Sequence, residues 1–125
     1  MKRIRIALLI LAAGLAGFAQ AADKHDHSPK HGGVVVEAKD ADYELVAKPE
    51  VIQLYVRDHG KAVDLKGASA KLTLLTGTEK QEVTLAATGD RLEARGTFKI
   101  AVGTKVVAVV TRPGKPSQTI RFALM

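Results

Sequence analysis

The residues best suited to chemistry lie close together near the N-terminus, in the stretch H-D-H-S-P-K-H-G-G at positions 25–33. It contains His25, His27 and His31, three of the four histidines of the chain, and Asp26 between the first two. Imidazole suits Cu(II), Ni(II) and Zn(II), and carboxylates raise the local negative charge. In an extended chain His25 and His27 lie on the same side, ~7 Å apart, and the turn-prone S-P-K allows His31 to fold back. These four residues are the predicted metal ligands.

Three alternatives stay open. A hydrophilic exported N-terminus can contain histidines by chance, because a short His-rich tract is compositional evidence only. Processing after Ala22 would create the terminus Asp23-Lys24-His25, whose amine, amides and imidazole form a square-planar nest for Cu(II) or Ni(II). His59 would complete a site if its hairpin lay beside the tail, although a two-residue turn with Gly60 at its second position explains His59 equally well.

The first 21 residues have the order of a secretory signal peptide. Three positive charges in MKRIR precede the apolar run 6–19, and Ala19 and Ala21 supply the small residues of a cleavage site. The run is shorter than the ~20 apolar residues of a membrane-spanning helix. We therefore expect a helical signal peptide over residues 1–21, cleavage on export, a periplasmic mature protein and no membrane association afterwards.

Composition limits the chemistry of the mature chain. It has no cysteine, so disulfides and thiolate metal sites are excluded. Lys2, Arg3 and Arg5 leave with the signal peptide, which reduces nineteen basic side chains to sixteen against thirteen acidic ones, a formal charge of +3. The basic residues are interspersed with acids and lack an aromatic platform, so no nucleic-acid partner is predicted.

From residue 33 onward apolar residues recur with period two, which indicates half-buried strands separated by turn signals. The predicted strands are 33–38, 42–48, 50–58, a short one near 62–65, 70–75, 80–87, 91–100, 104–111 and 117–124. The nearly continuous apolar run 104–111 predicts a central strand covered on both faces. The sequence therefore predicts an all-β domain over 33–125, an antiparallel immunoglobulin-like β-sandwich of seven to nine short strands. A flexible tail over 22–32 precedes it.

Enzyme signatures are absent from the sequence. Ser28, Ser69 and Ser117 have no histidine placed by sequence logic to activate them, and neither a nucleophile elbow nor a phosphate loop occurs. The chain is therefore predicted not to be an enzyme and to need no organic cofactor.

A resemblance to a known family rests on three segments: H-G-G-V-V-V (31–36), D-Y-E-L-V (42–46) and V-I-Q-L-Y-V-R-D-H-G-K-A-V (51–63). Together they resemble the N-terminal domain of some periplasmic adaptor subunits of heavy-metal efflux systems, and small stand-alone secreted proteins of proteobacteria. The resemblance covers about the first third of the mature chain. It implies a β-sandwich associated with copper, zinc, cobalt or nickel handling. Of the predicted ligands only His31 falls within the matching segments, so the resemblance assigns no ligand set.

Two functions from different classes follow as expectations. The first is a non-enzymatic periplasmic protein that binds or buffers Cu, Zn, Ni or Co in connection with metal efflux. No hairpin, lipoyl or barrel domain follows the β domain in this sequence, so we do not expect it to bridge a pump and a channel as an adaptor does. The alternative is a structural or protein-interaction module of the cell envelope with no metal role. Expected partners are thus a metal ion and an efflux-system or other envelope protein.

Overall fold

The computed structural model describes residues 27–125, which form nine strands and no helix. The strands are β2 (Val34–Ala38), β3 (Ala41–Lys48), β4 (Val51–Asp58), β5 (Lys61–Ala62), β6 (Ser69–Thr76), β7 (Glu79–Thr88), β8 (Arg91–Arg95), β9 (Lys105–Thr111) and β10 (Gln118–Ala123). None of the described residues forms an apolar helix of membrane-spanning length. The predicted signal peptide and the predicted ligands His25 and Asp26 lie outside the described residues.

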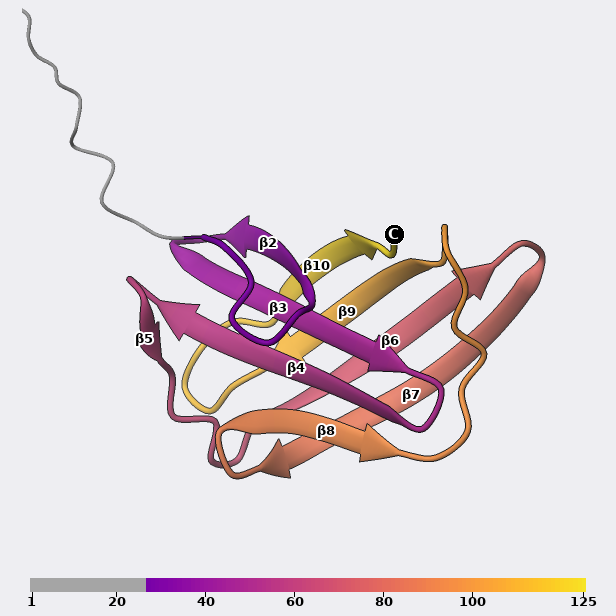
Figure 1. The fold of residues 1–125 in the computed structure, drawn as a ribbon. Helices are drawn as coiled ribbons and strands as arrows, with labels where there is room; N and C mark the ends of the chain where they lie inside the picture. The colour runs from indigo at the N-terminus through magenta and orange to yellow at the C-terminus, as the bar shows by residue number, and fades with distance from the viewer. Residues whose placement is uncertain (1–26) are drawn as a thin grey trace, which may run out of the picture.

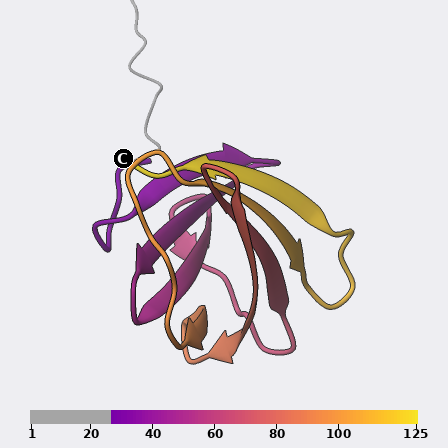
Figure 2. The same ribbon diagram turned by 90° about the vertical axis from the view of Figure 1, so that its right-hand side faces the viewer.

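All strand pairs are antiparallel and belong to one sheet of order β10-β9-β6-β7-β8-β4-β3-β2, with β5 paired to β4. The sheet curls until its end strands β2 and β10 contact each other (Figure 1). Seen from the side, β2, β3 and β4 form one wall and β6, β7 and β9 the opposite wall of a nearly closed structure (Figure 2). The prediction of an all-β antiparallel domain is confirmed.

The core occupies the space between these walls, and the period-two pattern of each strand fills it. Every second residue points inward, and the largest fully buried apolar side chains are Tyr43, Leu45, Ile52, Leu54, Leu65, Leu72, Leu74, Leu85, Leu92, Val106 and Ile120. The prediction that 104–111 is covered on both faces is wrong. In β9 buried and more exposed residues alternate, and Val109 on the outer face is 38% exposed. Only the inner face of β9 is buried, because β-branched residues also suit a half-exposed strand.

Two tight turns fix the register of β2 against β3 and of β4 against β5. Lys39 and Asp40 link β2 to β3, and His59 and Gly60 link β4 to β5. All four residues have positive φ, as the two central residues of a type I′ hairpin turn require. The prediction that His59 and Gly60 form a two-residue turn is confirmed.

The predicted strand 91–100 ends earlier than expected, at Arg95. Beyond it the chain leaves the ladder, and the amides of Gly96 and Phe98 donate to the carbonyls of Glu50 and Pro49 at 3.2 and 2.8 Å. Phe98 packs against the core from this irregular segment. Alternating apolar residues therefore continue past the strand end because they face the core from a loop.

Candidate metal centre

β3 is buried on both faces, which the alternation of its residues alone does not explain. Tyr43 and Leu45 point into the core, whereas Asp42 and Glu44 lie on the opposite face of the strand and are still only 6% and 0% exposed. Residues 27–33, which precede β2, lie over this outer face and bond to it (Figure 1). We call them the histidine segment. The segment was predicted as part of a flexible tail, but its described residues make specific contacts with β3 and β4.

Glu44 is the main attachment point of the histidine segment. Its carboxylate accepts hydrogen bonds from the backbone amides of Lys30 (2.9 Å), His31 (2.8 Å) and Gly33 (2.9 Å). Arg57 Nη1 donates to Glu44 Oε1 at 3.2 Å, and the ring Nδ1 of His31 lies 3.2 Å from the same oxygen. A buried charge is tolerated only when it is paired and hydrogen-bonded, and Glu44 meets both conditions.

The pKa of Glu44 reflects this environment. Burial opposes ionisation and by itself would raise the pKa of the carboxyl group. The hydrogen bonds from the three backbone amides and from His31 outweigh it and lower the pKa from 4.5 to about 2. Glu44 is therefore a carboxylate at neutral pH, and it can only accept hydrogen bonds.

The H-G-G sequence allows the histidine segment to approach β3 this closely. Gly32 has a φ of +77°, a conformation that costs glycine nothing. A Cβ on Gly33 would lie 2.8 Å from the carbonyl carbon of Leu45 and closer still to its oxygen. The two glycines thus have different roles: Gly32 adopts a positive φ in the bend that precedes β2, and Gly33 lets the backbone lie directly against β3.

His31 is held on both sides. Its ring stacks on Tyr55 with centroids 3.6 Å apart and planes 6° from parallel. The Tyr55 hydroxyl donates to Gln53 Oε1 at 3.3 Å, and Gln53 Nε2 donates to Glu93 at 2.9 Å. Offset or stacked aromatic pairs add stability beyond buried area. The Nδ1 of this ring is taken up by Glu44, so the geometry gives His31 an anchoring role.

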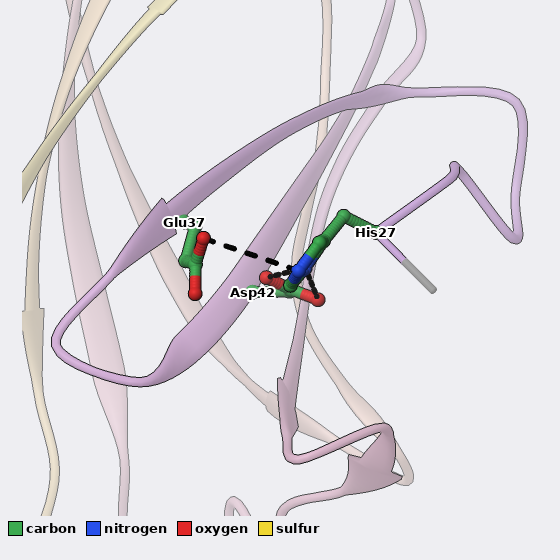
Figure 3. Close-up of side chains that lie close together, drawn as sticks. All are labelled: His27, Glu37 and Asp42. Atoms are coloured by element: carbon green, nitrogen blue, oxygen red, sulfur yellow. Dashed lines mark hydrogen bonds and ion pairs between the residues drawn. The ribbon is translucent and has the colours of Figure 1, made fainter. Parts of the chain in front are cut away.

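His27 lies between two carboxylates that face each other across the β2–β3 hairpin (Figure 3). Glu37 and Asp42 are register partners. His27 Nδ1 lies 2.9 Å from both oxygens of Asp42, and its Nε2 lies 4.0 Å from Glu37 Oε1. One donor atom from each of the three residues lies within 4.8 Å of the others, and no other group of three such side chains does so in the described part of the chain.

The hydrogen bond to Asp42 determines how the His27 ring can act. An ionised carboxylate accepts only, so Nδ1 carries the proton and a neutral ring has its lone pair on Nε2, the side of Glu37. Metal-binding histidines commonly donate their other ring N–H to a carboxylate, which fixes the tautomer and the ring orientation. The side chains of His27 and Glu37 are 43% and 58% exposed, so an ion can reach them from solvent.

The structure assigns different positions to the two predicted ligands that it describes, His27 and His31. His27 belongs to the three-residue group; His31 does not and instead contacts Glu44 and Tyr55. His25 and Asp26 lie outside the described residues. His59 stays in its turn, with Nδ1 2.5 Å from Asp58, and does not join the group.

Sequence reasoning missed Glu37 and Asp42. A signal for them exists, because a two-residue turn at Lys39 and Asp40 places Glu37 opposite Asp42. It also missed Glu44 and Arg57, which resemble ordinary solvent-facing residues of an alternating strand. Only the histidine segment lying over them reveals their role.

Comparisons with protein-family models, with curated proteins and with solved structures find no match to this chain. The resemblance to efflux-adaptor domains therefore stays a prediction. Function has to be inferred from the geometry of the site.

Proposed function

We propose that this chain is a non-enzymatic periplasmic protein that binds a divalent transition metal ion at His27, Glu37 and Asp42, as a buffer or as a donor to metal efflux. The observation that carries the proposal is the convergence of one imidazole and two carboxylates within 4.8 Å. The signal-peptide pattern supports the periplasmic compartment, and the resemblance to efflux adaptors supports the link to metal efflux. As part of this proposal, the two walls have an immunoglobulin-like arrangement.

The charges favour a dication. Glu37 and Asp42 are directly opposite on neighbouring strands, where like charges destabilise a sheet. A divalent cation between them would replace this repulsion by attraction to both. The donor set of nitrogen and oxygen suits Zn(II), Ni(II), Co(II) or Cu(II), whereas Cu(I) prefers thiolate or thioether sulfur.

The spacing is also suitable. Metal–nitrogen and metal–oxygen bonds to zinc are about 2.0–2.2 Å, and a tetrahedral site places two such ligand atoms about 3.4 Å apart, so exposed side chains slightly farther apart than this can close on an ion. His27 Nε2 and Glu37 Oε1 are separated by 4.0 Å. These two groups would be the ligands, and Asp42 would orient the ring or bind directly after a small rotation. His25, Asp26 or water would supply the other ligands.

The test is calorimetric titration of the mature, tag-free protein with Zn(II), Cu(II), Ni(II) and Co(II), after intact mass has fixed its first residue. We expect saturable binding that His27→Ala and Glu37→Gln each weaken at least tenfold. His59→Ala and Glu82→Gln, which change an exposed histidine and an exposed glutamate elsewhere, are the matched controls.

A separate His25→Ala variant tests whether the preceding histidine contributes. Deletion of residues 22–31 should remove binding altogether, and unchanged affinity after that deletion would exclude this segment as the site. If no ion binds saturably, the protein-interaction module of the envelope becomes the better hypothesis.

A further inference from the structure

We propose that Glu44, together with Arg57, positions the histidine segment so that His27 is presented to Glu37 and Asp42, and that metal affinity depends on this attachment. The inference rests on the proposed metal function and assigns to it two buried residues that do not themselves bind the ion. Glu44 is a positioning residue: it acts on the site through the backbone of the segment.

The contacts hold the histidine segment near both of its ends. Glu44 accepts from the amides of Lys30, His31 and Gly33, and Arg57 Nη2 donates to the carbonyl oxygen of Ser28 at 3.1 Å. Ser28 directly follows His27, and consecutive Cα atoms are only 3.8 Å apart. Attachment at Ser28 therefore leaves the His27 backbone little freedom.

Glu44, which anchors the segment, and Asp42, which belongs to the three-residue group, both lie on β3. Asp42 and Glu44 lie two residues apart on the same face of β3, about 6.6 Å along the strand. Arg57 is the register partner of Asp42 on β4, and Tyr55, on which His31 stacks, is the register partner of Glu44. The segment is thus fixed to the strand that carries Asp42 and to its neighbour.

Arg57 is used almost entirely for this attachment. Its side chain is 8% exposed; Nη1 bonds to Glu44 and Nη2 to the Ser28 carbonyl. Its Nε is buried and makes no hydrogen bond within the described residues. Glu44 also neutralises the guanidinium of Arg57. Without Glu44, the position across from Asp42 would hold a buried cation that has lost this carboxylate partner.

Outer-shell partners that orient metal ligands typically contribute 10–100-fold to affinity. Glu44→Gln should therefore weaken Zn(II) binding by about that factor, measured by titration of the full mature protein. Val83→Ala on β7 is the control for general destabilisation, because it shortens a core side chain at a distance from the histidine segment. It should leave the Zn(II) affinity within about twofold of wild type, since Val83 makes no contact with the segment or with its anchors.

A double variant separates position from charge. Because Arg57→Gln also removes the contact to the Ser28 carbonyl, the double variant Glu44→Gln with Arg57→Gln is compared with Arg57→Gln alone. If Glu44 acted only by neutralising Arg57, the two would bind equally well, and equal affinities would overturn the proposal. We expect the double variant to bind more weakly than Arg57→Gln, because glutamine has a single acceptor oxygen while the three amides use both oxygens of Glu44. Should Glu44→Gln fail to fold, Glu44→Asp keeps the charge but cannot reach all three amides, and it should lose about tenfold. Wild-type affinity in the aspartate variant would also refute the positioning role.

A metal-free readout distinguishes this inference from the proposed function. In NMR spectra of the apo protein, the Tyr55 ring should shift the His31 ring protons, and His27 should show contacts to Asp42. We expect both signals to disappear in Glu44→Gln. If the wild type binds no metal, the metal function fails, yet loss of these signals would still support positioning by Glu44. Their persistence in the variant would contradict it.

Discussion

Replacing Glu44 by Gln should destabilise the fold by about 3 kcal/mol at pH 7. The magnitude follows from the pKa of the native carboxyl group, which lies at about 2 against an ordinary value of 4.5. Each pKa unit corresponds to about 1.4 kcal/mol of preference for the ionised form in the folded state. Glutamine has the shape of the neutral acid, so it forfeits that preference and leaves Arg57 buried without its carboxylate.

The sign of the pH dependence follows from the same shift. A group whose pKa is lowered by folding contributes its full stabilisation above its unfolded pKa, and the contribution disappears as pH falls through the folded pKa. The wild-type advantage should therefore be constant above about pH 5 and decline between about pH 4.5 and pH 2. Below that range the stabilities of the two proteins should converge. The charged groups that face Glu44 are Arg57 and, when protonated, His31.

Urea unfolding of both proteins at a series of pH values, followed by far-ultraviolet circular dichroism, measures this difference directly. A typical domain is stable by 5–15 kcal/mol, so the variant should remain folded in the absence of denaturant. A loss below 1 kcal/mol at pH 7 would refute the argument, because it would mean that the amide and guanidinium contacts are replaced by water at no cost. A loss that does not change with pH would show that charge is not responsible.

Two further predictions concern stability and use urea unfolding as the assay. Gly33→Ala should lower the stability of the fold more than Gly32→Ala, because the new Cβ at Gly33 would collide with the β3 backbone. Gly32 has open space around it, so its alanine variant loses only about 1 kcal/mol of stability, for the positive φ. Equal losses of stability would contradict the close approach of Gly33 to β3. Thr104→Val should cost about 1–3 kcal/mol, because the fully buried hydroxyl bonds to the Thr76 hydroxyl at 2.8 Å and to a backbone amide at 3.2 Å. The exposed Thr111→Val is its control and should change stability by less than about 0.5 kcal/mol.

Much of the fold could be predicted from local patterns. The period-two pattern of the predicted strands 42–48 and 50–58 places Tyr43, Leu45 and Leu54 on their apolar faces, and all three are buried in the core. The His59–Gly60 turn followed from the glycine at its second position. Two strand predictions were wrong for different reasons. In β9 the apolar residues of the outer face are partly exposed, and beyond β8 the apolar residues face the core from an irregular segment.

The candidate site was only partly predictable. His27 was assigned as a ligand because histidines cluster around it, and it does lie in the one three-donor group of the described residues. His31 was assigned on the same grounds, but its ring is occupied by Glu44 and Tyr55. Clustering in sequence identifies the residue types that can bind a metal; it does not decide which rings point toward a common centre.

The sequence by itself determined the β-strand content, the inward faces of the strands, the turn at His59 and Gly60, and the presence of a histidine-rich segment near the N-terminus. These properties depend on side-chain period and local backbone preference, which act over a few residues. Tertiary structure alone decided that the segment lies over β3, that Glu44 and Arg57 hold it, and that His27 faces Glu37 and Asp42. Those contacts join residues 10–29 positions apart, and they exist only when the sheet has formed and a buried carboxylate can satisfy the amides of the segment.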